Sequence, residues 1–202
     1  MAKHNKVWIP AVIAVIAGLV LIAYSFYAQK SGIRPMPPGG GEGMPPREEE
    51  AFEPFKLMGT LSVVLGGISF MWMRFKKKLT STSGVIKKAG RLLYRVHPWT
   101  GWAALALVLI HGVYYLFTKL QDHAVFTGLA AFVILLTLAG YGWSIKRARG
   151  GYKRKVHFFL SIAWIPALLL HAGGSAVLTV VVSALVWMLV PMVERWTQSR
   201  AA

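Results

Sequence analysis

Six long runs of apolar residues, none of which contains Lys, Arg, Asp or Glu, dominate the pattern of the chain. A helix needs about 20 apolar residues to cross a hydrocarbon core that is about 30 Å thick. Only a helix can satisfy the backbone of such a run in hydrocarbon. We therefore predict an all-α membrane protein with six transmembrane helices, at residues 8–27, 57–73, 99–117, 125–145, 156–172 and 176–193.

The polar connections between these runs alternate in charge. The two chain ends and segments 74–95 and 146–155 hold 18 of the 23 Lys and Arg residues, with Glu194 as their single acid. Because cytoplasmic loops are rich in Lys and Arg, we expect both termini in the cytoplasm of a cell with a bacterial-type inner membrane. The third and fifth helices then run parallel. Segment 1–56 is expected to be an anchor helix plus an external loop rich in Pro, Gly and Glu.

Composition narrows the function classes. The chain is 55% hydrophobic with a net charge of +16, and its cations lie between apolar runs. This arrangement favours contact with membrane lipid and excludes a nucleic-acid partner. Cysteine is absent, which rules out disulfides, iron–sulfur clusters and covalent haem attachment. Histidine is then the strongest candidate metal ligand.

Four of the six histidines form two equally spaced pairs, His97 with His111 on the third helix and His157 with His171 on the fifth. Fourteen residues make almost four helical turns, so both members of a pair share one face, roughly 21 Å apart. Because the two helices are parallel, His97 is expected level with His157 and His111 level with His171. We predict two ligand pairs, the first near the cytoplasm and the second near the outer side.

A pair of facing imidazoles suits the iron of a b-type haem, which needs two axial ligands in an electron-transfer protein. We therefore expect two haem b groups in the core of a four-helix bundle. A single histidine in an apolar helix is more often a packed polar group, but the repeated spacing favours ligation. Zinc or copper is the competing metal, although a gap of roughly 21 Å along each helix forbids one four-histidine site.

Basic residues flank the histidines on the cytoplasmic side. Arg95, Arg154 and Lys155 are candidates to bind haem propionates through charge-assisted hydrogen bonds. Their alternative role is the positive-inside signal itself. Lys119 is a further candidate on the outer side. His4 and His123 are expected to be solvated surface residues.

The sequence around the histidines resembles the ferric reductase-like transmembrane cytochromes. That group includes the haem domains of NADPH oxidases and metalloreductases and the haem subunit of bacterial methionine sulfoxide reductase systems. The resemblance covers roughly residues 57–193 and rests on Arg-Val-His-Pro-Trp-Thr-Gly-Trp at 95–102, His-Gly at 111–112, Lys-Val-His at 155–157 and His-Ala at 171–172. It implies that 57–202 is a ferric reductase-like haem-binding transmembrane domain.

The resemblance further implies transmembrane electron transfer from a cytoplasmic reductant to an outer acceptor. We expect a cytoplasmic flavoprotein reductase or the quinone pool as the donor and a periplasmic or extracellular protein as the acceptor, and flow in the opposite sense is an alternative. The sequence ends soon after the sixth helix, so we expect a stand-alone haem subunit of a membrane oxidoreductase rather than a complete enzyme. The cytochrome b of quinol-oxidising complexes also spaces paired histidines in this way, and a quinol- or quinone-reacting subunit is therefore an alternative. A haem-free transporter or assembly subunit is another.

Overall fold

The described part of the chain, residues 7–31, 54–120, 122–147 and 151–199 of a computed structural model, is helical almost throughout. Each of its six α-helices is long and apolar enough to cross a membrane. The predicted all-α, six-span class is confirmed to that extent. The helices are α2 (Ile9–Lys30), α3 (Pro54–Phe75), α4 (Gly84–Thr118), α5 (His123–Arg147), α6 (Gly151–Ala172) and α7 (Gly174–Ser199), and η1 (Lys76–Lys78) is a short 3₁₀ helix after α3.

The helices extend beyond the apolar runs that predict them, and α4 does so most. It begins at Gly84 rather than at residue 99 and has 35 residues, which is about 52 Å of helix. Its first turns carry Lys87, Lys88 and Arg91. Lysine, arginine, alanine and leucine are good helix formers, so the helix continues where the apolar run stops. Apolar length marks the hydrocarbon core and not the end of a helix.

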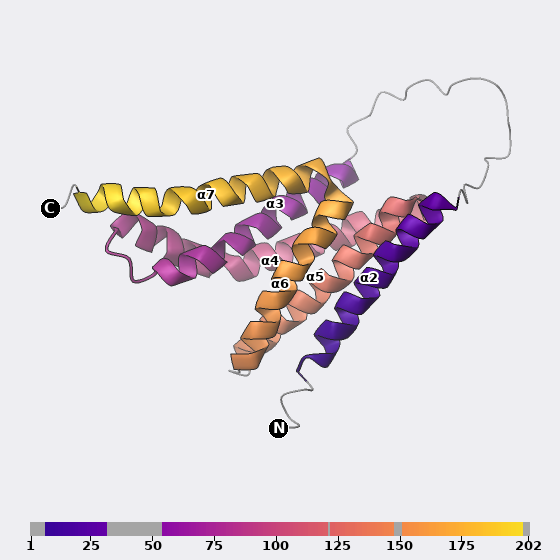
Figure 1. The fold of residues 1–202 in the computed structure, drawn as a ribbon, viewed down its shortest axis with the longest axis horizontal. Helices are drawn as coiled ribbons and strands as arrows, with labels where there is room; N and C mark the ends of the chain where they lie inside the picture. Colours follow the sequence, from indigo (N-terminus) through magenta and orange to yellow (C-terminus); the bar gives the residue numbers. More distant parts are fainter. Residues whose placement is uncertain (1–6, 32–53, 121, 148–150, 200–202) are drawn as a thin grey trace, which may run out of the picture.

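The six helices form two layers of three. In one layer α5 packs against both α2 and α6, and in the other α3 packs against both α4 and α7. Figure 1 shows that the two layers lie close together near the junction of α6 and α7 and spread apart toward the other ends of these two helices. Contacts of α4 with α5, α3 with α6 and α6 with α7 join them. Helices α3 to α6 thus surround the space between the layers.

The surface of the structure is apolar, as a bilayer requires. Phe117 is 84% exposed and Met188 is 72% exposed, and large apolar side chains stand outward along every α-helix. The buried positions are mostly small residues such as Ala130 and Ala176. Small residues let helices approach closely where lipid supplies no hydrophobic drive between them. A contiguous apolar surface of this extent belongs in lipid.

Both described ends of the chain lie at the end of the molecule that carries His97 and His157. The phenol of Tyr141, near the end of α5, donates a hydrogen bond to the carbonyl oxygen of Val7. Near the end of α7, Glu194 forms an ion pair with Lys78 and accepts a 2.6 Å hydrogen bond from Ser81 Oγ. Most of the predicted external loop, residues 32–53, falls outside the described residues, as does His4.

Candidate functional site

The structure brings the four histidines together in the two predicted pairs. The ring centroids of His97 and His157 are 6.2 Å apart, and those of His111 and His171 are also 6.2 Å apart. The ring planes cross at 83° in the first pair and 75° in the second. A metal about 2.0–2.1 Å from one nitrogen of each facing imidazole places the ring centres about 6 Å apart. Both pairs therefore have the separation that one shared metal ion needs.

Each of the four rings is held through its Nδ1 atom by a backbone carbonyl of the preceding helix. On α4, His97 donates to Ser69 O at 3.0 Å and His111 to Phe55 O at 2.7 Å. A carbonyl oxygen can only accept, so Nδ1 carries the proton. The lone pair of Nε2 is then the one left for a metal.

The same arrangement recurs on α6. His157 Nδ1 donates to Leu138 O at 3.1 Å, and His171 Nδ1 donates to Ala124 O at 3.0 Å. The two accepting residues on α5 have the same separation in sequence as Phe55 and Ser69 on α3. The hairpin of α3 and α4 and the hairpin of α5 and α6 are thus two copies of one ligand-holding unit. Nothing in the sequence patterns indicated this repeat.

Glycines explain how a ring can reach a carbonyl that already belongs to a helix. In a helix, the residue four positions after the accepting residue lies over its carbonyl. That residue is Gly59 for the carbonyl that holds His111, Gly128 for His171 and Gly142 for His157. A Cβ atom at Gly59 would lie 2.8 Å from His111 Cε1, and one at Gly128 would lie 2.6 Å from His171 Cε1. Close approach of this kind requires glycine. The equivalent position for His97 is Met73.

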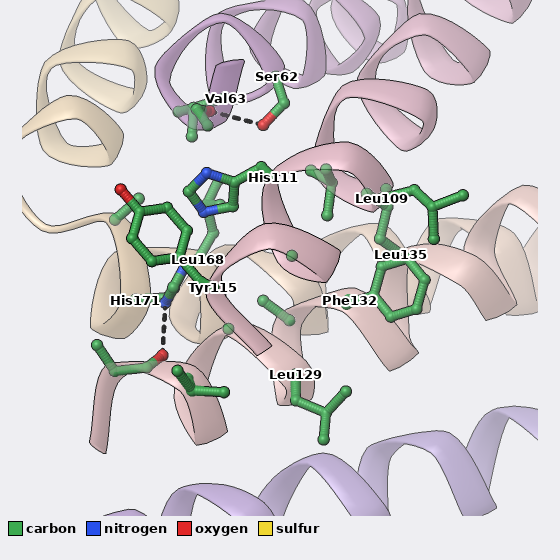
Figure 2. Close-up of a pocket in the computed structure, with 18 of the residues that line it drawn as sticks. Ser62, Val63, Leu109, His111, Tyr115, Leu129, Phe132, Leu135, Leu168 and His171 are labelled. Carbon is green, nitrogen blue, oxygen red and sulfur yellow. Dashed lines mark hydrogen bonds between the residues drawn. The ribbon is translucent and has the colours of Figure 1, made fainter. Parts of the chain in front are cut away.

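A cavity of about 840 Å³ opens beside the second pair. It lies within the range of about 300–1,000 Å³ that is usual for ligand and cofactor pockets. Figure 2 shows His111, Tyr115 and His171 on one side and Leu109, Phe132 and Leu135 on the other. The lining comes mainly from α3, α4, α5 and α6. An apolar planar group with two axial positions fits such a space.

Trp164 closes this cavity at the level midway between the two histidine pairs. It is seven residues from both His157 and His171, so it lies on the same face of α6 as both ligands. Its side chain is 7% exposed, and its Nε1 donates to Ala131 O at 3.1 Å. The same ring also lines a second, apolar cavity of about 300 Å³ between α3, α6 and α7. Trp164, together with Val63 and Leu168, therefore forms the wall between the two cavities.

Replacing Trp164 with alanine should merge the cavities and cost about 3–5 kcal/mol of stability, as other Trp→Ala changes in packed cores do. Trp164→Phe keeps most of the ring and loses the hydrogen bond to Ala131, so its cost should be about 0.5–1.5 kcal/mol. Thermal unfolding of the protein in detergent measures both. Trp99→Ala is the control, because Trp99 is 76% exposed. Equal effects at both positions would contradict the role given to Trp164.

The basic residues predicted to bind propionates are exposed. Arg95 and Lys155 each precede a histidine by two residues, which is about 200° of helical turn, so they leave their helices on the side away from the rings. The ammonium of Lys155 lies 5.6 Å from the ring centre of Tyr152. Arg154 is about 60° from His157 and stays the nearest candidate of the three.

Other residues departed from their expected places. His123 begins α5, and its Nδ1 atom is buried without a hydrogen-bond partner among the described residues, so a fully solvated role is wrong for it. Gly59 and Gly128 were not among the residues predicted to belong to the site. One signal could have found the second of them, because Gly128 and Gly142 are spaced along the sequence as the two histidines of each pair are.

The donor set argues against a metal held by protein ligands alone. Across the described ranges, no group of three or more His, Asp or Glu side chains could hold an ion. Structural zinc takes four protein ligands and catalytic zinc takes three. Two imidazoles are sufficient when a macrocycle supplies the other ligands, as in haem. No family model matches the chain, and no similar protein was found among curated proteins or solved structures.

Proposed function

We propose that this protein carries electrons across a membrane with two b-type haems, one held by His97 and His157 and the other by His111 and His171. One observation carries the proposal: in two pairs of imidazoles the ring centroids are the same 6.2 Å apart, and every Nδ1 is hydrogen-bonded to a carbonyl. Packed polar side chains have no reason to repeat one geometry four times.

The residues of the chain would orient, tune and protect the bound group. Each haem supplies a one-electron couple between ferric and ferrous iron. The four carbonyls fix the orientation of the rings. They also make the rings stronger metal ligands, because each hydrogen bond from Nδ1–H raises the basicity of Nε2. With two histidines holding each haem, neither site would leave a position open for substrate. The largely apolar walls around His111 and His171 would give the bound group an environment of low dielectric constant.

Orientation and partners belong to the same proposal. The end with His97 and His157 also carries Lys76–Lys78, Lys146 and Arg147, which favours placing it and both termini in the cytoplasm by the positive-inside rule. The cell membrane of a bacterial-type cell is the proposed location. A cytoplasmic flavoprotein reductase or the quinone pool would be the donor, and a periplasmic or extracellular protein the acceptor. The chain would act as the haem subunit of an oxidoreductase.

A second candidate, reaction with a membrane quinol or quinone, is favoured by the smaller cavity of about 300 Å³. Its walls include Phe70, Trp164 and Trp187. The rings of Phe70 and Trp187 stack at 5.4 Å. The Nε1 atom of Trp187 is buried and lacks a hydrogen-bond partner within the described residues. A quinone carbonyl is an acceptor that such a donor can use.

The experiment that tests the main proposal is spectroscopy of the purified protein. We expect sharp low-spin b-type absorption bands after dithionite and about two haems per chain. The nearly perpendicular ring planes should give the oxidised protein a strongly anisotropic low-spin EPR signal, because axial ring orientation sets the splitting of the iron d orbitals. A colourless protein from haem-replete cells would overturn the proposal and leave the transporter or assembly alternative.

A further inference from the structure

We propose that Lys56 and Lys119 form a cationic clamp at the mouth of the cavity beside His111 and His171, and that this clamp holds the two propionate carboxylates of the haem bound there. The inference rests on the proposed function and adds which way that haem faces. It adds Lys56, which no spacing from a histidine indicates, to Lys119, which the sequence already makes a candidate on the outer side.

The first step concerns charge along the cavity wall. Among the described residues, the charged side chains that line the cavity besides the two histidines are Lys56, Lys119 and Asp122. All three belong to the ends of helices: Lys56 lies in the first turn of α3, Lys119 is the C-cap of α4, and Asp122 precedes α5. The rest of the lining is largely apolar. A carboxylate is costly in such surroundings, so the propionates must lie at the end where the lysines are.

The second step ties each lysine to the ligand His111. Lys56 follows Phe55, whose carbonyl oxygen holds His111 Nδ1 at 2.7 Å. On α4, the ring of Tyr115 lies 4.8 Å from the ring of His111, and the ammonium of Lys119 lies 5.7 Å from the centre of the Tyr115 ring. These residues are four apart, so they form a ladder along one face of α4. Two separate elements thus bring a cation toward the same ligand.

Asp122 does not cancel the clamp. Its Oδ1 atom accepts a 2.9 Å hydrogen bond from the backbone nitrogen of Ala124 and so caps the start of α5. The formal charges of the described side chains at the mouth, two lysines and one aspartate, therefore sum to one positive charge. A charge-assisted hydrogen bond between ammonium and carboxylate is about twice as strong as a neutral one. Positive charge near the iron also favours the ferrous form, because reduction lowers the charge of the haem.

The test compares Lys56→Gln, Lys119→Gln and the double variant with Lys30→Gln. Lys30 ends α2 at the same end of the molecule and does not line the cavity. Lys30→Gln therefore removes the same charge as each single variant without changing the cavity. Haem transfer to apomyoglobin measures release, and a redox titration measures the two midpoint potentials. We expect release from one site to quicken about tenfold for each lysine removed. The midpoint potential of that haem should fall while the other stays unchanged.

The outcomes separate the two proposals. If the wild-type protein binds no haem, the proposed function and the clamp are both wrong. If it holds two haems, and release and potentials in the double variant match those of Lys30→Gln, only the clamp is wrong. The haem between His97 and His157 reports on folding, since a misfolded variant would lose both. Lys119→Arg should restore slow release, because arginine keeps the charge and binds carboxylates well.

Discussion

Replacing His111 with alanine should lower the haem content from about two per chain to about one. The remaining haem should be the one between His97 and His157, because that pair has its own carbonyl partners, Ser69 and Leu138. His111 lies about 21 Å along α4 from His97, so the two sites share no ligand. Pyridine haemochrome assay gives the stoichiometry, and a redox titration should lose one of its two components. His171→Ala should have the same result.

His123→Ala is the matched control for this experiment. His123 begins α5 near the same end of the molecule, but its ring belongs to neither of the two histidine pairs. The control should keep two haems. Retention of two haems by His111→Ala would show that His111 is not a ligand. Loss of both haems, with the protein still folded by circular dichroism, would contradict independent sites.

The Gly128→Ala variant should lose most of the same haem although it changes no ligand. The added methyl group would lie 2.6 Å from Cε1 and 3.1 Å from Nδ1 of His171, so the ring must move. Movement breaks the 3.0 Å bond from Nδ1 to Ala124 O, and the ring then no longer faces His111 at the required distance. Loss of such supporting contacts typically costs about 10–100-fold in metal affinity.

Gly140→Ala on the same helix is the control, because a Cβ atom there meets nothing within 4 Å. Alanine favours a helix by about 1 kcal/mol over glycine, so this variant should keep both haems and be at least as stable as the wild type. Haem content and thermal unfolding measure the two effects. Equal haem content in both variants would mean that contact between glycine and ring does not position His171.

The number of membrane-spanning helices could be predicted from the sequence, because the need to satisfy backbone hydrogen bonds in hydrocarbon acts on each segment separately. A backbone in hydrocarbon must bond within its own helix, and the thickness of the core fixes the length. The structure agrees on six such helices, yet α4 begins at Gly84, several turns before its apolar run starts. Helix ends depend on propensity and on packing at the membrane surface, as the ion pair of Lys78 with Glu194 illustrates, and hydropathy does not report either.

Histidine pairing also followed from the sequence. Equal spacing on two parallel helices fixes which rings are level, and the helical repeat is a constant of the backbone. The basic residues were less predictable from the sequence alone. Arg95 and Lys155 are each two residues from a ligand in sequence and turn away from it. Lys56, by contrast, is far from any ligand in sequence and lies beside the carbonyl that holds His111.

By itself, the sequence predicted a six-helix membrane protein with two level pairs of histidines, because both features depend only on length, hydropathy and helical period. Only the tertiary structure decided which carbonyl holds each ring, why Gly59 and Gly128 must be glycines, and that Trp164 separates two cavities. Those features depend on contacts between different helices. The distance and angle between two helices are set by side-chain packing across the whole bundle, which no single segment encodes.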